Sequence, residues 1–108
     1  DIDLGFAPDG HKTTEGDGRT PEGRYFIDRR NPNSAFYLSL GISYPNENDR
    51  AQAQARGVSP GGDIFIHGTP RQFRRQKDWT VGCIAVPDRE MRHIYAMVRE
   101  GTPIDIFA

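Results

Sequence analysis

Turn-forming residues divide this chain into short segments. It holds 12 glycines and 8 prolines in 108 residues, and they recur between runs of alternating apolar and polar side chains. Proline lacks an amide hydrogen and glycine is costly inside a helix, so both favour turns between strands. The pattern therefore predicts one mostly β domain, spanning residues 1–108, with few helices.

Six short runs have the composition or alternation of β-strands. The clearest is residues 35–44, in which alternate positions from Phe36 to Ile42 are apolar. Residues 24–28 could pair with it across a loop at 31–33 to form a hairpin. The other predicted strands are residues 1–7, 63–67, 81–86 and 102–107.

One segment near the C-terminus has the periodicity of an amphipathic helix. Asp88 is expected to cap its start and Gly101 to end it. A shorter helix is predicted in the mid-chain insertion, beginning at Asn48 or Asp49 and closed by Gly57. The apolar stripe of the longer helix consists of Met91, Ile94, Tyr95 and Val98.

Charge and hydropathy exclude some classes of protein. The net charge is −1, so nucleic-acid binding is not expected. No apolar run approaches the roughly 18 residues of a membrane span. The text at Asp1 resembles the interior of a domain, so we expect the first strands, and a removed secretory leader, to precede it.

The only cysteine, Cys83, follows His67 after a short connection, and each belongs to a predicted strand. If these strands are neighbours, the imidazole can take the thiol proton and leave a reactive thiolate. Gly82 lets an incoming carbonyl approach, and the N–H groups of Gly82 and Cys83 could form an oxyanion hole. The alternative is that Cys83 is a small buried apolar residue, the commoner fate of an isolated cysteine.

Other uses of these side chains are disfavoured. A single cysteine excludes an internal disulfide. His11, His67 and His93 are spread widely and show no metal-ligand spacing, so neither a metal nor another cofactor is expected. His93 lies off the apolar stripe of its helix and is expected at the surface.

Two polar segments could lie near the cysteine and histidine: one between them in sequence, and one well before both. Residues 71–77 are basic and predict either a short helix or a loop, which is a solvated face or a lip that attracts a carboxylate. Trp79 is expected to pack near the cysteine or to form an aromatic wall for a substrate. The glycine-rich stretch 8–23 predicts a long loop whose charged residues are solvated or touch substrate: His11, Lys12, Glu15, Asp17 and Arg19.

Two motifs together resemble a known family. The text IHG at 66–68 and TVGCIAV at 80–86 is similar to the His-Gly and Ser/Thr-x-Gly-Cys signature of the YkuD-type L,D-transpeptidase catalytic domain. GHKTTEGDGRTPEGRYFI at 10–27 resembles that family's TPxG hairpin. SYPNENDRAQA, SPGGDIFIHG and DWTVGCIAV resemble its proteobacterial, YafK-like branch. The resemblance implies the family's mostly β, sandwich-like fold with a helix packed beside it.

The resemblance also implies a chemistry. Cys83 would be the acyl-accepting nucleophile, His67 the base and the Gly68 carbonyl the group that orients the imidazole, with Gly82 and Cys83 amides as the oxyanion hole. The implied partners are peptidoglycan stem peptides in the periplasm, attacked between diaminopimelate and terminal D-alanine. The implied acceptors are a diaminopimelate amine, a lipoprotein lysine or a free D-amino acid.

Two positions depart from the family's common pattern. Val81 stands where many members have a second histidine, which leaves His67 as the base. Ala85 stands where many members have an arginine that contacts substrate. Because the YafK-like branch includes hydrolases, the catalytic alternatives to transfer are an L,D-carboxypeptidase and an amidase that releases lipoprotein. A separate alternative is a non-catalytic peptidoglycan-binding module that keeps the fold. With no arginine at position 85, the predicted substrate-binding residues are Arg19, Arg71, Arg74, Trp79 and Thr80.

Overall fold

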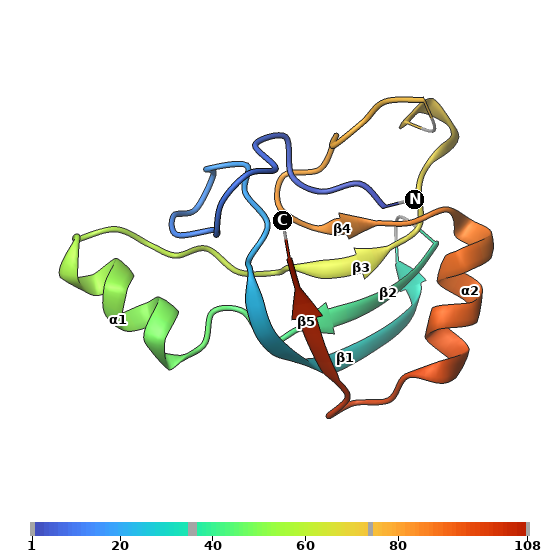
Figure 1. The fold of residues 1–108 in the computed structure, drawn as a ribbon. Helices are drawn as coiled ribbons and strands as arrows, with labels where there is room; N and C mark the ends of the chain where they lie inside the picture. Colours follow the sequence, from blue (N-terminus) through green and yellow to red (C-terminus); the bar gives the residue numbers. More distant parts are fainter. Residues whose placement is uncertain (1, 35–36, 74, 108) are drawn as a thin grey trace.

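A curled sheet with a helix at either end forms the frame of the protein (Figure 1). The computed structural model describes residues 2–34, 37–73 and 75–107. Over these residues the strand order is β4-β3-β2-β1-β5, which confirms the prediction of a mostly β fold with a main helix near the C-terminus and a short mid-chain helix. In chain order the elements are β1 (Gly23–Ser34), β2 (Tyr37–Ile42), α1 (Glu47–Ala55), β3 (Phe65–His67), the 3-10 turn η1 (Arg71–Phe73), β4 (Ile84–Ala85), α2 (Asp88–Met97) and β5 (Pro103–Ile106).

The antiparallel pair β1 and β2 forms the centre of the sheet. The predicted loop at 31–33 is wrong, because β1 continues to Ser34 and pairs Asn31 with Ser39. A register shift between that pair and the Ser34–Tyr37 pair accommodates Pro32, which has no N–H to donate to a ladder. The alternating positions predicted for β2 supply two fully buried side chains, Leu40 and Ile42; Phe36 lies outside the described residues.

Strand β3 is antiparallel to β2 and parallel to β4. Parallel neighbours need a crossover connection, and here the chain from Gly68 to Cys83 supplies it. The strand predicted at 81–86 is wrong in extent, because β4 comprises only Ile84–Ala85. A turn at Thr80–Cys83 precedes it, in which the Thr80 hydroxyl donates to the Cys83 carbonyl at 2.6 Å. Cys83, the candidate nucleophile, therefore lies directly before the first residue of β4.

The predicted strand at 1–7 is also wrong over its described part. Asp3 bridges Ala85 in antiparallel sense, whereas Gly5 bridges Thr80 in parallel sense, so no continuous ladder can form. The segment instead crosses the end of β4 and the turn before it. Figure 1 shows the chain before β1 and the β3–β4 connection on the same side of the sheet, next to β4.

Helix α2 covers the sheet with the predicted stripe: Met91 is fully buried, and Ile94, Tyr95 and Val98 pack against the core. Its predicted ends are wrong. The N-cap is Pro87, and Asp88 instead accepts a hydrogen bond from the Thr69 N–H at 3.0 Å. The helix ends at Met97, because Val98 is extended.

Helix α1 begins earlier than predicted. Asn46 is its N-cap and forms a capping box with Asp49, so neither Asn48 nor Asp49 starts the helix. Gly57, with φ of 68°, follows the C-cap and ends the helix as predicted. In the described part of the chain, no helix has the length and apolar composition needed to cross a membrane.

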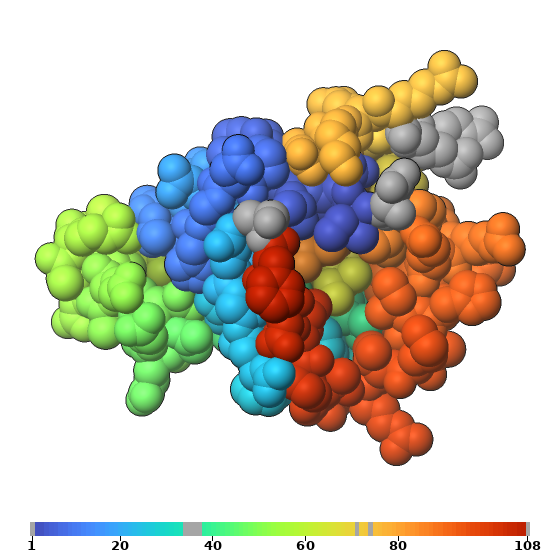
Figure 2. All heavy atoms as spheres, in the orientation of Figure 1, coloured from blue at the N-terminus to red at the C-terminus, as the bar shows by residue number. Residues whose placement is uncertain are grey.

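An apolar hollow lies between β5 and α2 (Figure 2). It is a cavity of about 330 Å³ whose walls are mainly isoleucines of the sheet and of α2. Neither His67 nor Cys83 lines it. The chemistry-bearing side chains therefore lie elsewhere, at the end of the sheet where the two loops meet.

Candidate active site

The parallel pairing of β3 and β4 brings the predicted histidine and cysteine to one region. His67 ends β3 and pairs with Ala85, which lies two residues after Cys83. The thiol packs against the start of β3, where the Phe65 N–H donates to Cys83 Sγ at 3.4 Å. Sγ also lies 3.6 Å from the Asp63 carbonyl, to which the thiol can donate. Burial raises the pKa of the Cys83 thiol above its usual value.

His67 is buried, and its ring is held by its own chain. Nδ1 lies 2.7 Å from the Gly68 carbonyl oxygen. A carbonyl oxygen only accepts, so Nδ1 carries the proton and the basic lone pair is on Nε2. Burial lowers the pKa of His67, and the Gly68 hydrogen bond only partly opposes this. A neutral imidazole in a fixed tautomer therefore lies beside the strand that follows Cys83.

Gly82 has a conformation that other residues adopt only with strain. Its φ is 136°, and a Cβ here would lie 3.0 Å from the Arg19 carbonyl oxygen and 3.1 Å from Ile64 Cδ1. Its N–H donates to Thr80 Oγ1 at 3.2 Å. One of the two predicted oxyanion donors is thus engaged within the turn, while the Cys83 N–H makes no hydrogen bond to any described residue.

Two stacked aromatic rings lie next to His67. The Trp79 ring stacks on Phe73 with centroids 4.3 Å apart and lies 5.7 Å from the His67 ring. Trp79 therefore packs against His67. Thr80, by contrast, is only 4% exposed, and its hydroxyl is used within the turn before Cys83.

The predicted basic residues divide into two groups. The backbone of Arg19 lies against Gly82, with its side chain exposed. Arg71 belongs to η1, and Arg74 lies outside the described residues. Arg75 and Lys77 are exposed, and Figure 2 shows the segment around them projecting from the body of the protein.

Two residues of the glycine-rich loop differ from the prediction of a solvated loop. Lys12 is only 3% exposed, and its ammonium group pairs with Asp17. His11 is bonded to Asp49 at 2.8 Å and accepts from the Glu22 N–H. The partner of His11 is remote in the chain, so sequence patterns gave no signal of that contact, whereas the Lys12–Asp17 pair is local but its burial depends on remote residues such as Gly61 and Gly82. His93 is exposed as predicted, and no cluster of three potential metal ligands occurs among the described residues.

A mostly β fold thus brings a histidine of fixed tautomer and a thiol to two neighbouring parallel strands, the two groups that nucleophilic catalysis by cysteine uses. The family model of the L,D-transpeptidase catalytic domain, YkuD, matches residues 3–106. The chain belongs to this family.

Relatives agree with that membership. YafK of Escherichia coli strain K12, a provisional L,D-transpeptidase, is 30% identical over 91 residues, which cover 82% of this chain and 32% of that protein. Among solved structures, the helical cell shape determining protein Pgp2 of Campylobacter jejuni has a TM-score of 0.76 at 29% identity, covering 97% of this chain and 36% of that one. Bd1075 of Bdellovibrio bacteriovorus has a TM-score of 0.67 at 26% identity, covering 98% and 37%. The chain thus spans about a third of the length of these relatives.

Proposed function

We propose that this domain is a cysteine L,D-transpeptidase acting on peptidoglycan stem peptides in the bacterial envelope. Cys83 Sγ attacks the carbonyl carbon between diaminopimelate and terminal D-alanine, and His67 Nε2 takes the thiol proton. The C–N bond breaks, His67 returns the proton to the leaving amine of D-alanine, and a thioester remains on Cys83. An acceptor amine, from a second diaminopimelate or a lipoprotein lysine, then attacks the thioester and releases the thiol.

The observation that supports this most is the 2.7 Å contact between His67 Nδ1 and the Gly68 carbonyl. It fixes the tautomer in which Nε2 is the base, next to the strand that carries the cysteine. Burial keeps the thiol protonated and the imidazole neutral. The proton is therefore transferred as Sγ attacks the carbonyl, as general-base catalysis requires, and no preformed thiolate is needed.

The Cys83 N–H is the first donor that we assign to the oxyanion. The Gly82 N–H donates to Thr80 Oγ1 at rest, so it joins only if the carbonyl oxygen of the substrate replaces that hydroxyl. Thr80 contributes by holding the turn, because its hydroxyl also binds the Cys83 carbonyl.

Substrate recognition is assigned to the two sides of this turn. The Trp79–Phe73 stack offers an aromatic wall beside the base. Arg19 on one side and the basic segment that begins with Arg71 on the other are proposed to bind the carboxylates of the stem peptide. Arg74, which lies outside the described residues, stays a proposed member of this set.

One observation favours hydrolysis as the second candidate. Ala85, which replaces a substrate-binding arginine of many relatives, is fully buried and paired with His67, so this position presents no cation to a substrate. Water in place of the acceptor amine would make the enzyme an L,D-carboxypeptidase or an amidase. Incubating sacculi with the protein and analysing the fragments by mass spectrometry separates the two. New diaminopimelate–diaminopimelate links support transfer, whereas loss of links without new ones supports hydrolysis.

Acylation of the thiol tests whether the domain is catalytic at all. A carbapenem should add one covalent adduct to Cys83, detected by intact-protein mass, and Cys83→Ala should show none. His67→Ala should slow the adduct, whereas His93→Ala, an exposed histidine on α2, should leave the rate unchanged. An unreactive thiol in the folded wild-type protein would instead favour a non-catalytic peptidoglycan-binding module.

A further inference from the structure

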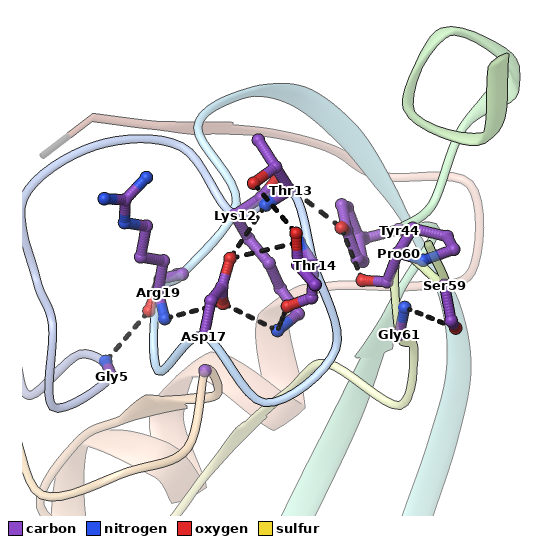
Figure 3. Close-up of polar contacts among 12 residues, drawn as sticks. Gly5, Lys12, Thr13, Thr14, Asp17, Arg19, Tyr44, Ser59, Pro60 and Gly61 are labelled. Atoms are coloured by element: carbon purple, nitrogen blue, oxygen red, sulfur yellow. Dashed lines mark hydrogen bonds and ion pairs between the residues drawn. The ribbon is translucent and has the colours of Figure 1, made fainter. Parts of the chain in front are cut away.

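A lysine of the glycine-rich loop is buried against the turn that holds the cysteine. Lys12 Nζ donates to Asp17 Oδ1 at 3.1 Å and to the Thr14 carbonyl at 3.2 Å (Figure 3). Its side chain is 3% exposed, whereas that of Asp17 is 17% exposed. Buried lysines are rare, because an ammonium group loses much hydration there. The position of this charge therefore needs an explanation.

The ammonium group lies next to Gly82. A Cβ built on Gly82 would be 3.8 Å from Lys12 Nζ, and one built on Gly61 would be 3.4 Å from Lys12 Cε, both ordinary van der Waals distances. The lysine side chain therefore packs against these two glycines. Gly82 immediately precedes Cys83, so the cation lies close to the peptide that joins Gly82 to the cysteine.

Few other charges face this thiol. The Asp63 carboxylate opposes ionisation of Cys83 and the Lys12 ammonium group favours it, although burial has the largest effect on the pKa of the thiol. Asp17 accompanies Lys12, and Arg29 pairs with Asp63 at 3.5 Å. Among the described residues, His67 on the neighbouring strand is a further titratable group near the thiol, and burial lowers its pKa.

We propose that Lys12 is a positioning residue of the acyl-transfer reaction: held by Asp17, it supplies a fixed positive charge beside the Gly82–Cys83 peptide that stabilises the negative charge formed during attack. This inference rests on the proposed function. The thiol proton goes to His67 Nε2, and negative charge passes from Sγ to the carbonyl oxygen of the substrate. Lys12 neither gains nor loses a proton. In a site with low local dielectric such a fixed charge acts more strongly than in water.

Lys12 could instead serve only to tether the loop, and two opposite substitutions separate these roles. Lys12→Met removes the cation and leaves Asp17 as an uncompensated anion. Asp17→Asn leaves the cation uncompensated. An electrostatic role predicts opposite changes in the pKa of Cys83, upward for Lys12→Met and downward for Asp17→Asn, whereas a tether predicts the same loss of loop order in both.

The experiment is the pH dependence of Cys83 alkylation by iodoacetamide, with circular dichroism to confirm folding. Lys12→Met should raise the apparent pKa of the thiol by about one unit, which slows alkylation at pH 8 by up to about tenfold. Lys12→Arg should retain most of the wild-type profile. Arg92→Met, which removes an exposed cation on α2, is the matched control and should leave the profile unchanged.

Shifts of the same sign in Lys12→Met and Asp17→Asn, or an unchanged profile in Lys12→Met, would overturn the inference. If Lys12→Met does not fold, Asp17→Asn and Lys12→Arg still decide it: a lower pKa with the first and a retained profile with the second support it, and any other result overturns it. Alkylation needs no peptidoglycan. Opposite shifts in a protein that fails to acylate from stem peptides would therefore contradict the proposed function and leave the charge effect intact.

Discussion

Two loops meet at Gly82 and Cys83, and they are built differently. In the glycine-rich loop, Asp17 accepts hydrogen bonds from three backbone N–H groups and from Lys12 Nζ. Burial alone would raise the pKa of Asp17, but bonds from Thr13 and Arg19, then Lys12 and Thr14, lower it to about 2. This loop is fixed by its own polar contacts.

In the basic segment on the other side, Phe73 stacks on Trp79. Its cations Arg75 and Lys77 are exposed, and Lys77 contacts the Ile2 carbonyl and Asp3 at the surface. This difference agrees with the two roles proposed above, in which the fixed loop sets the electrostatics at the thiol and the exposed segment selects the substrate. Substitutions on either side of the site test this difference.

Replacing the base should have the largest effect. His67→Gln keeps a polar side chain but cannot accept a proton, so carbapenem acylation should slow by about 10²–10⁴-fold. The exposed-site variant His93→Gln is the control. Stopped-flow or intact-mass kinetics measure the rate. A decrease of less than about tenfold, well short of the expected range, would show that His67 is not the base.

Gly82→Ala should disturb the fixed side of the site. The positive φ and the two close contacts of a new Cβ should cost about 1–3 kcal/mol of stability and displace the turn that presents the thiol. Gly62→Ala is the matched control, because a Cβ there meets nothing within 4 Å and the glycine lacks a positive φ. Chemical denaturation gives the free energies. Equal stabilities for the two variants would contradict the strained conformation.

Local patterns predicted the parts of this protein that local physics determines. The alternation in β2 and the stripe of α2 follow from which face is buried. The short apolar runs indicated β3 and β4 as strands, whereas their parallel pairing was only a condition of the predicted site. His67 at the end of an apolar run and the Gly82–Cys83 pair were also predicted, because each is a local motif in the sequence.

Contacts between remote segments were not predictable in this way. Nothing near Lys12 in sequence shows that Gly61 and Gly82 will enclose it, and nothing near Asp49 shows that its carboxylate will accept from Tyr25 and bind His11. The run at 1–7 alternates as a strand does, yet its two bridges have opposite sense. Burial of a polar residue depends on the segment that covers it, which its own neighbours do not encode.

Acidification should remove activity before it disrupts the fixed loop. Burial lowers the pKa of His67 below 6.5, so the imidazole stays neutral to a lower pH than a free histidine would. Once the pH falls below the pKa of His67, the acylation rate should decrease about tenfold per pH unit. The free energy of unfolding also declines below pH 6.5, because unfolded His67 binds the proton more readily.

The contribution of Asp17 behaves differently. Its pKa falls from 3.8 to about 2, so the stability that it provides is complete above pH 3.8 and is lost as the pH falls towards 2. Acylation rates and denaturation midpoints, measured on one pH series, test both limbs. A rate that starts to fall above pH 7 would show that His67 is not held neutral by burial.

The exposed cations should have the smallest effect, and one confined to substrate selection. Arg75→Gln and Lys77→Gln each remove a solvated charge worth up to about 1 kcal/mol, so KM for a carboxylate-bearing stem peptide should rise by at most about fivefold. Salt should abolish the difference, because a Debye length is only about 3 Å at 1 M. The alkylation profile of Cys83 should not change, in contrast to Lys12→Met. If these variants shift that profile as Lys12→Met does, the exposed segment also sets the electrostatics at the thiol, and the division between the two loops fails.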